Sequence, residues 1–129
     1  MATRARVGWR LAAVAAGLGA VAVALGAFGA HGLEGAVTPE RLETWRTGAQ
    51  YHLAHALAGV AAGVLAALRG SAAAHWAGRL FLAGIALFSG SLYALVLLDL
   101  PVLGAVTPLG GVAFIAGWAA LATALWRAG

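Results

Sequence analysis

The stretch Gly48-Ala-Gln-Tyr-His-Leu-Ala-His-Ala-Leu57 opens an apolar segment that continues without a charged residue to position 68. About 20 such residues span the hydrocarbon core of a bilayer as a helix. The stretch also carries Tyr51, His52 and His55. Ionisable side chains within a membrane usually face other helices or a water-filled cavity. The stretch therefore predicts a membrane-spanning helix with one polar face.

Composition extends this prediction to the whole chain. Of the 129 residues, 63% are hydrophobic and 9% are charged, and there is no cysteine. Soluble domains contain about 25% charged residues, so lipid is the solvent that this composition fits. The net charge is +4, and the basic residues are all arginines at the ends of apolar runs. That distribution fits membrane flanks and argues against nucleic-acid binding, and the lack of cysteine excludes disulfides and thiol chemistry.

Four apolar runs of membrane length predict a single all-α transmembrane domain over residues 1–129, folded as a bundle of four helices. We place the spans at about 11–30, 49–68, 80–98 and 109–126. The first run could also be a signal peptide, but signal cores usually have about 7–15 residues, which favours a retained helix. Gly59 and Gly63 are four residues apart, a spacing that allows close approach of another helix.

A short amphipathic helix at about 39–47 is expected between the first two spans. Thr38-Pro39 is a typical helix start, because Thr caps the helix and Pro suits its first position. Trp45 is placed as an anchor at the membrane interface. Gly48 would allow a bend before the second span.

The arginines predict the topology. Six of them fall on one side of four spans and two on the other, and the side richer in Lys and Arg is cytoplasmic. Both termini are therefore expected in the cytoplasm. The six are Arg4, Arg6, Arg10, Arg69, Arg79 and Arg127.

With this topology, most polar residues of the spans fall in the outer half of the bundle. This expected polar cluster, a candidate ligand or proton site, comprises His31, Tyr51, His55, Ser89, Tyr93, Asp99 and Thr107. His55, paired with His31 across the first turn, is the expected centre. His52 is expected to be an interfacial neighbour. The alternative interpretation is that these side chains only join helices through hydrogen bonds.

No enzymatic motif stands out, since the chain has no HExxH sequence, no Walker loop and no Gly-x-Ser-x-Gly sequence. His52 and His55 alone are a weak metal signal, because no carboxylate is fixed near them within the spans. A haem held by two histidines would need a histidine on another span at matched depth, and the third and fourth spans have none. We expect no enzyme activity, no metal and no cofactor.

Four blocks of the sequence together resemble the family called domain of unknown function 423. They are Gly26-Ala-Phe-Gly-Ala-His-Gly-Leu33, Tyr51-His-Leu-Ala-His-Ala-Leu57, Phe88-Ser-Gly-Ser-Leu-Tyr93 and Thr107-Pro-Leu-Gly-Gly111. The resemblance implies a small four-helix membrane protein and no activity. We expect it in the bacterial cytoplasmic membrane. At His52 the family more often has glutamine, which implies that His52 is not essential and gives His31 and His55 more weight.

We therefore expect a non-enzymatic packing or accessory protein of the membrane. A small solute or proton-linked transporter or channel is the first alternative, because histidine titrates near neutral pH. A metal or haem binder is the second. The expected partners are the lipid bilayer and either further copies of the chain or a larger membrane complex.

Overall fold

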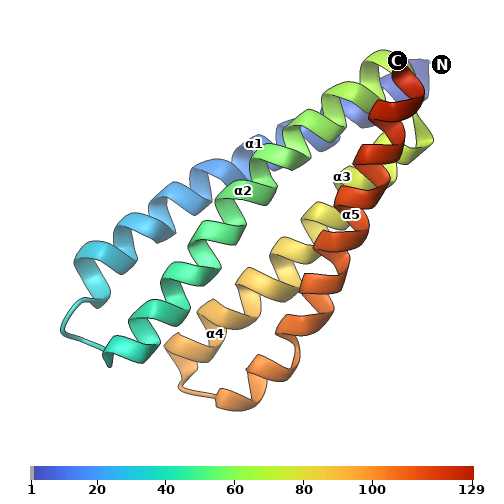
Figure 1. Ribbon diagram of the computed structural model, residues 1–129. Helices are drawn as coiled ribbons and strands as arrows, with labels where there is room; N and C mark the ends of the chain where they lie inside the picture. Colours follow the sequence, from blue (N-terminus) through green and yellow to red (C-terminus); the bar gives the residue numbers. More distant parts are fainter. Residues whose placement is uncertain (1) are drawn as a thin grey trace.

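A computed structural model describes residues 2–129, and within that range the chain is helical with no strand. Four helical rods, Ala2–Leu33, Pro39–Arg69, Ala72–Leu98 and Pro101–Ala128, are each long and apolar enough to cross a membrane. They lie lengthwise in an elongated molecule with both chain ends at the same end (Figure 1). The predicted all-α membrane architecture with four spanning helices is confirmed.

Three of the rods contain a local change of helix type. The first consists of α1 (Ala2–Phe28) and a π-helical turn, η1 (Gly29–Leu33). The second is α2 (Pro39–Arg69) alone. The third joins α3 (Ala72–Gly84), a π-helical turn, η2 (Ile85–Ser89), and α4 (Gly90–Leu98), and the fourth joins a 3-10 turn, η3 (Pro101–Ala105), to α5 (Thr107–Ala128).

Local signals set the two ends of α2. The Thr38 hydroxyl oxygen accepts a hydrogen bond from the Arg41 backbone N–H at 3.3 Å, and Pro39 occupies the first helical position. At the other end, Gly70 adopts φ 63°, and its N–H donates to the Ala66 carbonyl at 2.9 Å. A left-handed glycine is a common helix terminator, because it has no Cβ to clash. The predicted helix start at Thr38-Pro39 is confirmed.

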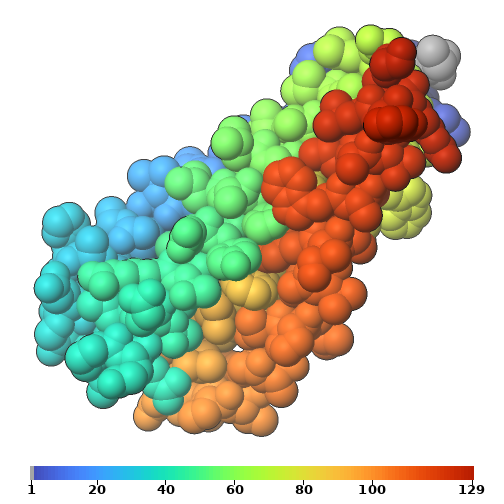
Figure 2. Space-filling view, viewed as in Figure 1, coloured from blue at the N-terminus to red at the C-terminus, as the bar shows by residue number. Residues whose placement is uncertain are grey.

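The helices pack in the order α1, α2, α3–α4, α5. Helix α1 lies along α2, α2 also packs on α3 and α4, and α5 packs mainly on α3 and η2. Contact between α2 and α5 is light, although both contribute to one face of the molecule (Figure 2). The outer helices α1 and α5 carry exposed apolar side chains such as Val23 and Ile115, as a lipid-facing surface requires.

Glycines bring α1 and α2 into close contact. A Cβ at Gly63 would lie 2.6 Å from the backbone nitrogen of Ala12, and one at Gly59 would lie 3.0 Å from the Cβ of Ala15. Such spacing is below van der Waals contact, so only glycine fits at Gly63 without moving a backbone. The Gly59–Gly63 pair therefore provides the close-packing face expected of its spacing, and its partner is α1.

The separate interfacial helix predicted at 39–47 is not observed, because these residues are the first turns of the continuous helix α2. Gly48 lies within that helix and leaves room for Tyr93, whose Cε1 would be 3.1 Å from a Cβ there. The prediction that Trp45 is an interfacial anchor is wrong. Its side chain is only 1% exposed, and its indole N–H donates to the Leu25 carbonyl at 2.8 Å. Burial of the large ring is tolerated because that polar N–H has a partner.

Candidate functional site

The polar side chains expected to form one cluster instead make separate hydrogen bonds along the bundle. Most of these bonds join two helices that are distant in the sequence. The two histidines of α2 illustrate the pattern, because each bonds to a different neighbouring helix.

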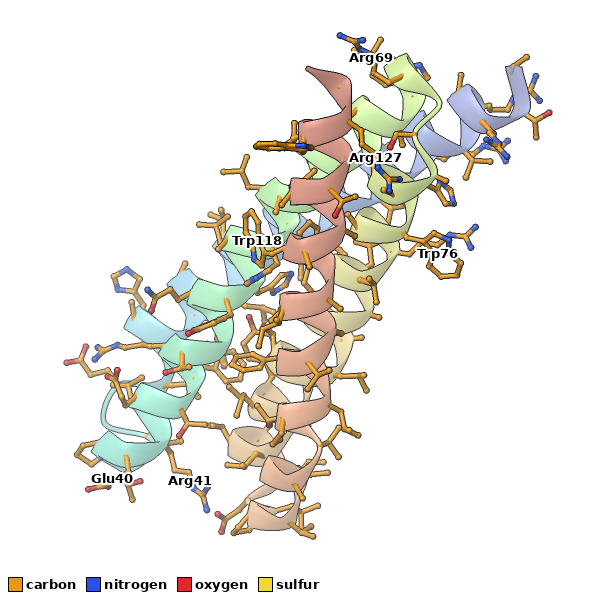
Figure 3. All side chains as sticks on the ribbon, turned by 45° about the vertical axis from the view of Figure 1, so that its right-hand side comes forward. Glu40, Arg41, Arg69, Trp76, Trp118 and Arg127 are labelled. Carbon is orange, nitrogen blue, oxygen red and sulfur yellow. The ribbon has the colours of Figure 1, made fainter. Side chains whose placement is uncertain are left out.

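His55 links α2 to α5. Its Nδ1 lies 2.7 Å from the Tyr51 carbonyl oxygen one turn earlier, and the Trp118 indole N–H donates to its Nε2 at 3.0 Å. Trp118 lies about midway along the molecule, where α5 passes α2 (Figure 3). A carbonyl only accepts and an indole N–H only donates, so Nδ1 must carry the proton and Nε2 must be bare. The two bonds therefore define one neutral tautomer.

Aromatic rings enclose His55. The Phe114 ring stacks on the imidazole with a centroid distance of 3.5 Å and an interplanar angle of 12°. Phe81 and Tyr51 lie at 5.7 Å and 5.9 Å. With both ring nitrogens occupied, a second proton on Nε2 would face the Trp118 N–H and break that bond. The arrangement suits a structural link better than a proton relay.

His52 is buried between helices and does not lie at the membrane interface. It was expected at the interface, but it is only 2% exposed, and its Nδ1 lies 2.9 Å from the Tyr93 hydroxyl on α4. Its Nε2 is buried and makes no hydrogen bond to any described residue, and the Leu18 backbone of α1 is close to the imidazole. His52 thus fills the space where α1, α2 and α4 meet.

Serine and threonine join further helix pairs. The Ser89 hydroxyl, on η2, donates to the Gly48 carbonyl at 2.7 Å and is fully buried. The Ser91 and Thr107 hydroxyls are 2.6 Å apart and connect α4 to the start of α5. Thr107 is the first residue of α5, and its hydroxyl pairs with that of Ser91.

His31 and Asp99 lie outside these contacts. His31 is exposed in η1, and the Asp99 side chain is 84% exposed and pairs with Arg41 at 3.0 Å. The expected pairing of His31 with His55 is wrong. Because α2 starts at Pro39, His55 lies about 16 residues into the helix, roughly 24 Å from its start. A second span that begins at about residue 49, as predicted, would place His55 too close to the turn.

Sequence reasoning missed Trp118 as a partner of His55. A signal was available, because Phe114 and Trp118 are four residues apart and so share one face of their helix. That spacing marks an aromatic face on α5. It does not say which other helix the face meets, and that assignment came only from the folded chain.

The structure shows a cavity at each end of the molecule. One of about 280 Å³ lies beside the start of α1, and one of about 770 Å³ lies beside the start of α2 and Asp99. Neither is lined by His31, His52 or His55. Within residues 2–129, no three histidine or carboxylate side chains gather as a metal site would require.

The four apolar rods, joined by buried hydrogen bonds, define a small polytopic helical membrane protein. The chain belongs to the family described as protein of unknown function (DUF423), whose model matches residues 25–111. All four sequence blocks that carried the resemblance fall within that range.

Close relatives bear the same kind of name. The UPF0382 membrane protein YwdK of Bacillus subtilis is 54% identical over 99 residues, covering 76% of this chain and 80% of the relative. The UPF0382 membrane protein SAB0533 of Staphylococcus aureus is 47% identical over 107 residues, covering 83% and 87%. No solved structure matches the chain.

Proposed function

We propose that this protein is a non-enzymatic packing or accessory protein of the bacterial cytoplasmic membrane. The observation that carries the proposal is the double hydrogen bond of His55, whose two ring nitrogens both hold helices in place. Ser89 and Ser91 are used in the same way, as links between helices. Polar side chains that hydrogen-bond between helices stabilise the bundle. The same groups are then not available to bind a substrate or transfer a proton.

The transport alternative requires His31, His55, Tyr93 and Asp99 around one water-accessible path. In the single chain, His55 bonds to Trp118, Tyr93 contacts His52, and Asp99 pairs with Arg41. Their different positions along the bundle favour the packing role. The metal and haem alternative depended on His52 and His55 as a pair of ligands. Their rings face different helices, which disfavours that alternative.

Two measurements test the proposal. Purification in a mild detergent followed by native mass spectrometry is expected to show a stoichiometric membrane partner or further copies of the chain. Proteoliposomes containing a pH-sensitive dye are expected to show no proton flux above protein-free vesicles, with an ionophore as positive control. Proton flux that His55→Gln abolishes would overturn the proposal, and so would a solitary monomer in several mild detergents.

A further inference from the structure

Charge is divided between the two ends of the molecule. The four acidic side chains of the chain are Glu34, Glu40, Glu43 and Asp99. They belong to the end formed by the first and third connections, whereas Arg69 and Arg127 lie at the opposite end (Figure 3). The two ion pairs among the described residues, Arg41–Asp99 and Arg46–Glu43, are both at the acidic end.

The end that carries the chain termini therefore holds basic side chains without acidic ones. Six arginines belong to it, and none forms an ion pair with an acidic side chain in residues 2–129. Like charges gathered in this way repel one another unless counter-charge is supplied. All six are exposed, so their charges are open to an anionic ligand from outside the fold. The six are Arg4, Arg6, Arg10, Arg69, Arg79 and Arg127.

Part of this basic end is hollowed. The cavity of about 280 Å³ lies between the first turns of α1 and the connection from α2 to α3. Two of the arginines contribute to its wall, one from α1 and one from α3. The polar and aromatic residues that line it are Thr3, Arg4, Ser71, His75, Trp76 and Arg79.

The donors in this cavity suit a phosphate group. Arg4 and Arg79 supply guanidinium groups, which match phosphate oxygens in charge and geometry. Ala72, at the first turn of α3, also lines the cavity, and the Ser71 side chain caps the N–H of Ala74 at 3.1 Å. First-turn N–H groups have no acceptor within the helix, so the start of α3 favours an anion beside the arginines.

Two features favour a lipid over a protein partner. Trp76 is 57% exposed beside the cavity, and the Arg79 guanidinium carbon lies 5.5 Å from its ring centroid. Tryptophan and arginine together are typical of the level of the headgroups. The cavity is also small, just below the range of small-molecule sites, which is about 300–1,000 Å³. A protein partner would need roughly 800 Å² of surface on each side.

We propose that this cavity binds the phosphate of an anionic phospholipid headgroup, with Arg4 and Arg79 as the charged ligands and Trp76 packing beside the glycerol backbone. The site lies at the end expected to face the cytoplasm, where anionic lipids attract basic segments. The inference is independent of the proposed accessory role. Its ligand is a component of the bilayer and not a substrate.

A matched pair of double variants tests the site. Arg4→Gln/Arg79→Gln removes the two cavity arginines, and Arg69→Gln/Arg127→Gln removes two others from the same end. Native mass spectrometry with added phosphatidylglycerol or phosphatidylcholine measures retention of lipid on the protein. We expect the wild type to prefer phosphatidylglycerol, the cavity variant to bind it roughly tenfold or more weakly, and the control to stay within about twofold.

Equal loss of phosphatidylglycerol binding in both variants would overturn the proposal, because the effect would then come from diffuse surface charge. Absence of a preference for phosphatidylglycerol over phosphatidylcholine would overturn it as well. Inorganic phosphate at millimolar concentration tests a free anion as the ligand, and binding of phosphate without lipid preference argues against a headgroup site. A co-purifying acidic protein released by Arg4→Gln/Arg79→Gln, with no lipid bound, would assign the site to a protein. Equal thermal stability of all variants confirms that folding is unaffected.

Discussion

The Trp118 indole N–H donates to the Nε2 of His55 at 3.0 Å and so ties α5 to α2, beside the Phe114 ring that stacks on the same imidazole. The two residues are 63 positions apart in the sequence. Because the other ring nitrogen of His55 bonds to the Tyr51 carbonyl, the imidazole must be the neutral Nδ1–H tautomer. This pair gives the polar face of α2 a structural role.

A double-mutant cycle on this pair measures its contribution to stability. His55→Leu leaves the Trp118 indole N–H without its partner, and Trp118→Phe removes the donor while keeping an aromatic ring. Interhelical hydrogen bonds in membranes average about 0.6 kcal/mol and reach roughly 1.7 kcal/mol, so we expect a coupling free energy in that range. Unfolding in mixed detergent–SDS micelles reports the four free energies. Additive effects of the two substitutions would contradict a stabilising bond.

The close contact of α1 with α2 predicts opposite effects of two Gly→Ala substitutions. At Gly63 the new Cβ would lie 2.6 Å from the Ala12 backbone nitrogen, so Gly63→Ala should destabilise the fold by about 1–3 kcal/mol. At Gly17, on the exposed face of α1, nothing lies within 4 Å. Gly17→Ala should be neutral or stabilise by up to about 1 kcal/mol through helix propensity. The same unfolding assay compares them, and a harmless Gly63→Ala would show that the helices can separate freely.

Asp99 combines a turn conformation with an exposed ion pair. Its φ is 51°, which asparagine tolerates and β-branched residues do not. Asp99→Asn, which removes only the charge, should cost less than about 1 kcal/mol, as exposed ion pairs do. Asp99→Val should cost about 1–2 kcal/mol more, because of left-handed strain. Thermal unfolding in detergent separates the two, and a large loss with Asp99→Asn would mean that the carboxylate matters beyond the turn.

Reporter fusions test the expected orientation. Both ends of the chain lie at one end of the molecule, and the arginine excess predicts that this end is cytoplasmic. Alkaline phosphatase fused after Gly129 should be inactive, and the same enzyme inserted at Gly35, in the first connection, should be active. Activity at the C-terminus would reverse the assigned topology and move the proposed lipid site to the outer leaflet.

The class of the protein and several helix ends could be predicted from the sequence. The length of an apolar run can be read from consecutive residues. Helix starts such as Thr38-Pro39 depend on atoms only a few residues apart. The start of α2 was nevertheless judged incorrectly in one respect. The pattern predicts a separate amphipathic helix before the second span, whereas α2 continues as one helix through Gly48.

The partners of the polar residues could not be predicted. His52 and Tyr93 are 41 positions apart, as are Ser89 and Gly48, and each contact depends on how the helices are rotated about their axes. Periodicity places His52 and His55 close on one helix surface. It does not reveal that one ring turns toward α4 and the other toward α5.

The sequence by itself determined an integral membrane protein with four helices and basic residues at one end, because composition and local capping act over short distances along the chain. Only the tertiary structure decided that Trp45 is buried, that His55 bonds to Trp118, and that Arg4 and Arg79 share a cavity. Those relationships join residues on different helices. They depend on glycine-mediated close packing and on pairing each buried polar atom, which are properties of the assembled bundle.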